Sequence, residues 1–421
     1  MSDTPSLLLL LVAPALAGGL VYFLRLWPRL PHLTAALAAL GTAYSIHLAP
    51  AGLADELLGR PLVLDGPAKQ VLLVALMAVA LSNVASLARP AETLFASTSL
   101  ALASLVGLAL TTDNLTLAGL FLVIGGVVLT VSLESSRGVT AGHLQYLAAV
   151  ALGGTLLAFA AGIMDADPYV PSASGAVALQ LGIGLLLGLF PVGLWKATLG
   201  RDADSFSSAL VGLVLAPAAV VLLWRFTWRY PWLSSGTLLS ELLRVSALVT
   251  VGYFSLRAAI TASPTVYVAS ATQSQFALVV LVLLPSLGSS ALLPLTSEWL
   301  LARVVPVLLL AVSVPLLWTA PRPATKVLFV FSVLSLIGLP GTPLFSSYLA
   351  GLLALPQGAL DVALLIFMAG TAVGALRLAL MPPAVPPPVD RLDPGTLVAL
   401  LLALITVIVG LNPAFLRGLL A

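Results

Sequence analysis

A series of long apolar stretches joined by short connections constrains this chain more than any other feature. A helix needs about 20 mainly apolar residues to cross the hydrocarbon core of a bilayer. We predict fourteen such transmembrane helices, at 5–24, 31–49, 68–88, 92–112, 114–133, 141–163, 175–200, 203–227, 239–262, 265–285, 297–319, 325–356, 359–380 and 395–416. Only the connections at 50–67 and 381–394 exceed a dozen residues, and the second is a proline-rich linker. The sequence therefore predicts an all-α integral membrane protein, with residues 1–421 forming a single polytopic domain.

Composition excludes several classes of function. With 60% hydrophobic and 8% charged residues, the chain is not a water-soluble enzyme. Eighteen Lys plus Arg against sixteen Asp plus Glu leave a formal charge of +2 and no basic patch, so nucleic acid is not an expected partner. The chain has no cysteine and three scattered histidines, so we expect no metal site, cofactor or catalytic residue in it.

The distribution of Lys and Arg predicts an orientation, because cytoplasmic loops carry the excess of positive charge. With fourteen spans both termini lie on one side of the membrane. That side receives seven of the eighteen Lys and Arg, and the opposite side receives eleven. Both termini are therefore expected on the non-cytoplasmic side. The first stretch follows SDTP rather than a basic segment, and we interpret it as a retained helix rather than a signal peptide.

Prolines interrupt two of the predicted spans near their middle. Pro191 follows an apolar run and precedes Trp195 and Lys196, and Pro340, Gly341 and Pro343 fall within four residues of one another. Irregular backbone at membrane depth is tolerated only where protein or a water-filled cavity shields it. A pair of interrupted helices, one in each half, is typical of inverted-repeat transporters. A proline kink satisfied by neighbouring helices is the alternative at each position.

Five ordered segments resemble the antiporter-like membrane subunits of respiratory complex I. SLIGLPGTPLF at 335–345 resembles the family segment S-L-x-G-I-P-P-x-x-G-F, and PVGLW at 191–195 is similar to P-F-H-F-W. APAAVVLLWRF at 216–226, VASATQSQFALVVLVL at 268–283 and HLQYLAAVALGGTLL at 143–157 resemble three further helices, with Gln275 and Tyr146 on family residues. Together the segments cover about residues 90–380. Length and span number fit the N-type subunit of the NADH-quinone oxidoreductase best.

The resemblance implies an architecture and partners. It divides the domain into N-terminal helices (1–91), a first five-helix repeat (92–227), an inverted second repeat (239–380) and a C-terminal helix (395–416). It implies a place in the bacterial inner membrane beside other subunits of a respiratory-type complex, within the lipid bilayer. Flavin, iron–sulfur and quinone cofactors are then expected in the partner subunits.

The resemblance also implies a row of buried lysines and a glutamate that carry protons, and this chain departs from it there. The family's glutamate and lysine positions fall at uncharged residues, namely Leu122, Leu186, Ala216, Tyr348 and the pair Thr265 and Val266. Burial can lower the pKa of a lysine by several units, which makes it a switchable charge. Without these groups the family's relay is absent, and we expect an accessory subunit with a degenerate proton channel.

Some polar residues remain as candidates for an ion path: Lys196, Arg257, Tyr348, Gln275, His143 and Glu298. Lys196 follows the first interruption and could face a cavity there, whereas Arg257 could equally reach toward the membrane surface. Glu298 and Arg303 are expected at the membrane interface. Buried glutamines such as Gln273 and Gln275 are more often contacts between helices than parts of a path, and Gly125-Gly126 and Gly153-Gly154 would let helices approach closely.

Three functions stay open at this point. The first is the accessory subunit of a complex I-like assembly. The second is a working translocator of the same superfamily, as in Mrp-type antiporters or membrane-bound hydrogenases, that uses other groups. The third is an independent secondary transporter whose interrupted helices bind a solute through their half-helix ends.

Overall fold

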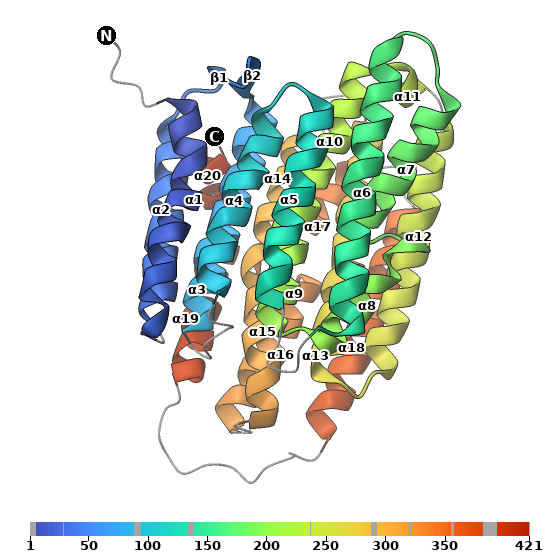
Figure 1. The fold of residues 1–421 in the computed structure, drawn as a ribbon. Coiled ribbons are helices and arrows are strands. Elements are labelled where there is room, and N and C mark those ends of the chain that lie inside the picture. Colours follow the sequence, from blue (N-terminus) through green and yellow to red (C-terminus); the bar gives the residue numbers. More distant parts are fainter. Residues whose placement is uncertain are drawn as a thin grey trace.

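A computed structural model describes residues 6–27, 29–87, 94–133, 139–235, 237–287, 293–319, 322–354, 358–381 and 394–420. In this part the long helices run side by side, as Figure 1 shows. They are α1 (Leu7–Phe23), α2 (Leu30–Leu48), α3 (Gly66–Ser86), α4 (Phe95–Thr111), α5 (Leu115–Leu133), α6 (Ala141–Ala166), α7 (Ala173–Leu187), α8 (Trp195–Asp202), α9 (Ser205–Leu210), α10 (Ala216–Arg229), α11 (Trp232–Ser235), α12 (Thr237–Ile260), α13 (Pro264–Leu283), α14 (Leu293–Ala302), α15 (Val304–Thr319), α16 (Pro323–Ile337), α17 (Pro343–Ala354), α18 (Ala359–Leu380), α19 (Pro394–Leu411) and α20 (Pro413–Leu420).

Eleven helical segments in the described residues are long and apolar enough to cross a membrane. Three shorter apolar helices, Phe95–Thr111, Pro323–Ile337 and Pro343–Leu353, fall within two further predicted spans. The remaining predicted span, 31–49, forms α2, where His32, His47 and several hydroxyl side chains lower the mean hydropathy. The chain is thus a helical, multi-span membrane protein, and the number of fourteen crossings stays a prediction.

Burial separates central from peripheral helices. In the helix Pro264–Leu283, 94% of the central apolar stretch is buried inside the protein, and the same share is buried in Leu295–Leu317. The value falls to 33% for Leu7–Leu26 and for Pro394–Leu411. A helix that is apolar all round and buried all round belongs to the centre of a bundle, whereas exposed leucine and valine faces suit contact with lipid tails or other membrane helices. The centre therefore holds α13, α14 and α15.

The connection at 50–67 contains a β-hairpin that the all-α prediction missed. Strand β1 (Leu53–Leu57) pairs antiparallel with β2 (Arg60–Leu64), Leu53 opposite Leu64. The turn places Leu58 and Gly59 at φ of 52° and 72°, as a two-residue hairpin turn requires. The predicted linker at 381–394 lies outside the described residues apart from its two end positions.

The hairpin is fixed to the helices by polar contacts. Asp55 accepts hydrogen bonds from the Ser6 hydroxyl and the Leu8 N–H at the start of α1, and these bonds hold the pKa of the Asp55 carboxyl below its usual range. Arg225 on α10 forms an ion pair of 2.7 Å with Asp65 and donates to the Thr112 carbonyl at 3.0 Å. Asp55 thus ties the hairpin to α1, and Arg225 ties α10 to the start of α3 and the end of α4.

Helices α5 and α6 approach closely at glycines, as the paired glycines predict. A Cβ added at Gly154 would lie 2.3 Å from Val123 Cγ2 and 2.9 Å from the Gly119 carbonyl oxygen. One added at Gly126 would lie 2.2 Å from Val150 Cγ1. Small residues at such contacts let two helix backbones approach in a membrane.

Substituting Gly154→Ala should therefore destabilise the chain, whereas Gly162→Ala on the same helix should not. The added methyl at residue 154 meets the backbone of α5, and overpacking of this kind costs roughly 1–3 kcal/mol. A Cβ at Gly162 meets nothing within 4 Å, so alanine there gains up to about 1 kcal/mol of helix propensity. Thermal unfolding of the two purified variants in detergent measures the difference, and equal midpoints would contradict the close α5–α6 contact.

Candidate functional site

The helix around Pro191 is interrupted for seven residues. Helix α7 ends at Leu187, and Gly188 follows at φ 67°, a left-handed conformation that favours glycine. The Leu189 N–H donates to the Gly184 carbonyl at 2.9 Å, which closes the helix end. A short 3-10 helix (Val192–Leu194) then leads into α8.

The second interruption has the same construction. Helix α16 ends at Ile337, Gly338 follows at φ 84°, and α17 begins at Pro343. The Tyr348 hydroxyl on α17 donates to the Leu336 carbonyl at 3.0 Å. A Cβ at Gly338 would lie 2.4 Å from the Tyr348 ring, so this ring covers the glycine.

Lys196 occupies the corresponding place at the first interruption. Its side chain covers Gly188, where an added Cβ would lie 2.7 Å from Lys196 Cε. The Lys196 ammonium is buried and donates to Gln273 Oε1 at 2.6 Å. Gln273 Nε2 in turn donates to the carbonyls of Leu187 at 3.0 Å and Gly188 at 2.9 Å. The last carbonyls of a helix lack helical partners and carry partial negative charge. The Gln273 amide donates to two of them and, through its own oxygen, accepts a hydrogen bond from the Lys196 ammonium.

Arg303 lies at the junction of α14 and α15 and is fully buried, at 1% exposure. It does not lie on the protein surface, and its predicted place at the membrane interface stays a prediction about depth. Its guanidinium donates to Gln275 Oε1 at 2.7 Å, the Gly212 carbonyl at 2.9 Å and the Thr272 carbonyl at 3.2 Å. It is held inside the bundle because these acceptors replace water.

The Gly212 carbonyl is available because its helix is locally a π-helix, over Val211–Leu215. Pro217 has no N–H to donate to the carbonyl of Leu213, which favours a departure from α-helical hydrogen bonding just before it. Such single-turn bulges are frequent at functional sites. The segment joins α9 to α10.

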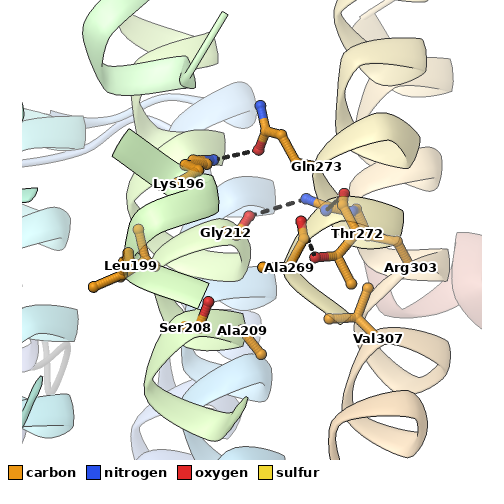
Figure 2. Close-up of a pocket in the computed structure, with 11 residues that line it drawn as sticks. Lys196, Leu199, Ser208, Ala209, Gly212, Ala269, Thr272, Gln273, Arg303 and Val307 are labelled. Atoms are coloured by element: carbon orange, nitrogen blue, oxygen red, sulfur yellow. Dashed lines mark hydrogen bonds between the residues drawn. The ribbon is translucent and has the colours of Figure 1, made fainter. Parts of the chain in front are cut away.

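A cavity of about 20 Å³ lies between these elements, room for one water molecule. Figure 2 shows Lys196 and Arg303 reaching it from opposite sides. The Phe276 ring lies near both cations, with Lys196 Nζ 5.4 Å and Arg303 Cζ 4.7 Å from its centroid. The lining consists of Lys196, Leu199, Ser208, Ala209, Val211, Gly212, Ala269, Thr272, Gln273, Arg303 and Val307.

Of the predicted candidates, Lys196 lines the cavity and Gln275 contacts it through Arg303. Tyr348 stays at the second interruption, where its ring contacts Trp299 at a centroid distance of 4.9 Å. Glu298 is half-buried on α14 and is not among the residues that line the cavity. Sequence reasoning named Arg303 but did not place it at this cavity, although a cation inside an apolar span was a usable signal.

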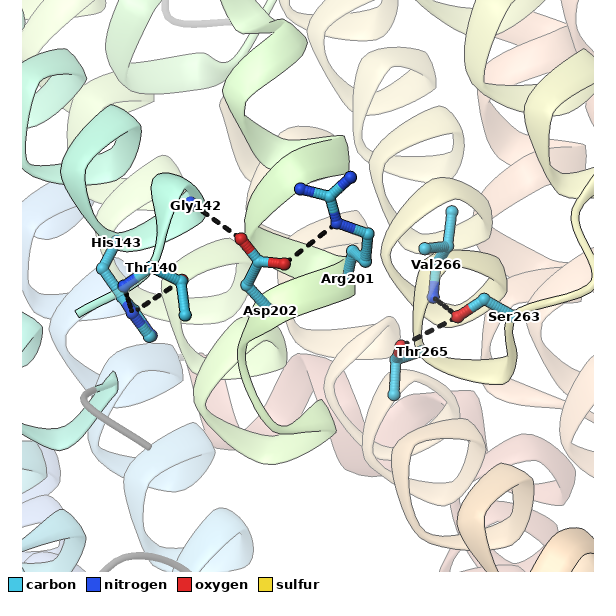
Figure 3. A network of polar contacts seen from close by, with 8 residues as sticks. All are labelled: Thr140, Gly142, His143, Arg201, Asp202, Ser263, Thr265 and Val266. Carbon is cyan, nitrogen blue, oxygen red and sulfur yellow. Dashed lines mark hydrogen bonds and ion pairs between the residues drawn. The ribbon is translucent and has the colours of Figure 1, made fainter. Parts of the chain in front are cut away.

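Arg257 and His143 lie away from the cavity lining. Arg257 is half-buried on α12 and donates to the Tyr253 hydroxyl at 2.9 Å. His143 Nδ1 accepts from the Thr140 N–H at 3.1 Å and so caps α6. Beside it the Asp202 carboxylate accepts from the Gly142 N–H at 2.9 Å and pairs with Arg201, as Figure 3 shows. The His143 and Asp202 contacts thus cap the start of α6.

The positions that the family resemblance assigns to charges are apolar or neutral, and all of them except the half-buried Thr265 are buried. Leu122, Leu186 and Ala216 are buried, as is Tyr348. The Thr265 hydroxyl lies 3.1 Å from the Ser263 hydroxyl, and Ser263 caps the start of α13. In the described residues no group of three His, Cys, Asp or Glu side chains could hold a metal ion.

Replacing Arg303 should destabilise the bundle more than replacing the half-buried Arg257. Arg303→Met removes three hydrogen bonds between helices, a loss of about 2 kcal/mol or more at the values measured in membranes, since buried acceptors are left unpaired. Arg257→Met removes one described bond and should cost at most about 1 kcal/mol. Thermal unfolding in detergent compares the two, and an equal or smaller loss for Arg303→Met would contradict this assignment.

Comparison with known proteins identifies the fold. No protein-family model matches the chain, and no curated protein matches it in sequence. Among solved structures, a chain of the Mrp complex from a Dietzia species superposes with a TM-score of 0.81 at 19% identity, over 99% of this chain and 51% of that one. The present chain thus spans about half the length of that Mrp chain.

Two other assemblies contain chains of matching length. A chain of the membrane-bound sulfane sulfur reductase, an archaeal respiratory membrane complex, gives a TM-score of 0.78 at 18% identity over 98% of this chain and 95% of that one. A chain of respiratory complex I from Thermus thermophilus gives 0.76 at 21% identity over 98% and 99%. The chain therefore has the fold of membrane chains from the Mrp complex, the sulfane sulfur reductase and complex I, which confirms the predicted structural resemblance.

Proposed function

We propose that this chain is an antiporter-like membrane subunit of a complex I-like assembly, of the N type, with a structural or accessory role and a degenerate proton channel. The observation that carries the proposal is the combination of the shared fold with apolar side chains at the family's charged positions. Leu122, Leu186 and Ala216 are all buried. A relay of protonatable side chains cannot use them.

The proposal includes the arrangement in two inverted five-helix repeats, 92–227 and 239–380. The matching construction of the two interruptions supports it, since each has a glycine of positive φ covered by a side chain of the following helix. Flavin, iron–sulfur and quinone sites then belong to partner subunits. The membrane is the bacterial inner membrane, with both termini on its non-cytoplasmic side.

A second function, ion translocation by a non-standard path, is favoured by one observation. Lys196 is a buried lysine beside an interrupted helix and lines a cavity large enough for water. A working subunit of an Mrp-type antiporter or a hydrogenase could use such a group. Arg303 cannot replace a second lysine in this role, because arginine stays protonated in proteins.

Association with other membrane subunits is the first expected result. The outer faces of α1, α2, α18 and α19 expose many large apolar side chains, which fits burial against lipid and other helices. Affinity purification of the tagged chain in mild detergent, followed by mass spectrometry, should recover redox subunits and further membrane subunits. A monodisperse monomer that transports a solute by itself in liposomes would instead support an independent transporter.

Substitution of Lys196 separates the accessory role from translocation. In the reconstituted complex, Lys196→Met and Tyr348→Phe should each leave the number of protons moved per electron pair unchanged, because neither group belongs to a working relay. Lys69→Met, at a buried lysine outside the cavity lining, is the matched control. A fall in the ratio for Lys196→Met in an intact complex, with the control unchanged, would establish the translocating alternative.

A further inference from the structure

The cavity between Lys196 and Arg303 is lined by more hydrogen-bond donors than acceptors. A lysine ammonium carries three N–H donors and a guanidinium five. Four described hydrogen bonds use them, to Gln273, Gln275, Gly212 and Thr272. The Thr272 hydroxyl donates to the Val268 carbonyl at 2.8 Å. Four of the eight N–H donors of Lys196 and Arg303 thus have no described protein acceptor.

The charge at this place is also unbalanced. Lys196 is 7% exposed and Arg303 is 1% exposed. Five ion pairs occur among the described residues, and none includes either cation. Neutral amide and carbonyl oxygens solvate the two charges without neutralising them, and buried charges are ordinarily paired. Two like charges that share one aromatic neighbour, Phe276, repel each other at low dielectric.

We propose that this cavity binds a small monovalent inorganic anion of the size and charge of chloride. An anion accepts hydrogen bonds from both cations and supplies the missing negative charge. Water fits the volume as well, but it carries no charge and would leave the two cations without a counter-charge. The room of about 20 Å³ excludes polyatomic anions such as sulfate or phosphate.

The other residues that line the cavity are also compatible with a bound anion. Ser208 on α9 adds a hydroxyl that can donate to the anion, and the remaining lining is mostly alanine, leucine and valine, which exclude competing water. The site joins α8, α9, α13 and α15, so a bound anion would hold the second half of the interrupted helix against the bundle centre. The inference concerns this chain alone and does not depend on any partner subunit.

Thermal unfolding of the full chain in nanodiscs provides the first test. At constant ionic strength the unfolding temperature should rise saturably as chloride or bromide replaces gluconate, since a ligand that binds only the folded state stabilises it. Lys196→Met and Arg303→Met should each abolish the rise, whereas Lys69→Met should retain it. A rise of equal size in Lys196→Met and Arg303→Met would assign the effect to the surface and overturn the proposal.

Bromide provides a direct second test that requires no variant. Crystals of the wild-type chain grown in bromide should give an anomalous difference peak between Lys196 Nζ and the Arg303 guanidinium. An empty cavity or an ordered water without an anomalous peak at saturating bromide would overturn the proposal. Lys196→Gln, which keeps a polar side chain of similar reach, should lose the peak and so covers the case in which methionine does not fold.

Discussion

The carbonyls of Leu187 and Gly188 at the end of α7 depend on one side chain, Gln273, because a helix end inside a bilayer cannot rely on water for its last carbonyls. The Gln273 amide donates to Leu187 and Gly188 and accepts from Lys196. These hydrogen bonds hold α13 against the interruption that follows α7. They also determine the orientation of the Gln273 amide, with its NH2 group toward the carbonyls and its oxygen toward Lys196. This arrangement also explains how a lysine remains buried without a carboxylate, since the helix end lends it partial negative charge. The second break has a neutral counterpart in the Tyr348 hydroxyl and the Leu336 carbonyl.

The sequence predicted the features that depend on local chemistry. Pro191, Pro340 and Pro343 indicate interrupted helices because proline cannot continue helical hydrogen bonding, and the apolar stretches indicate the spans. The hairpin was missed although Gly59 follows Leu58 between two short strands, since the connection was interpreted only by its length. Its signal was a glycine in a two-residue turn.

Arg303 could not be placed from sequence because everything that holds it lies elsewhere in the chain. Glu298, the acidic residue nearest to it on the same segment, is five positions away, and residues five apart on a helix point about 140° away from each other. The three acceptors belong to Gln275, Gly212 and Thr272. The Gly212 carbonyl is available only because of the π-helix, and Pro217 is the one feature of the sequence that indicates this π-helix. An exposed place at the interface is the default for an arginine near a helix end, and tertiary contacts bury Arg303 here instead.

The π-helix at Val211–Leu215 has a consequence for how this chain can change by insertion and deletion. The span that contains it is fixed at two points, by Arg303 on the Gly212 carbonyl and by Arg225 on Asp65 and Thr112. A π-helical turn holds one residue more than an α-helical turn. Deleting one residue between Leu215 and Arg225 would leave that turn in place and rotate the segment that follows by about 100°. Arg225 would then face away from Asp65 and Thr112 even if every side chain were retained. The number of residues between Gly212 and Arg225 is therefore under tighter constraint than their identity, and homologous chains with this pair of contacts should keep that number.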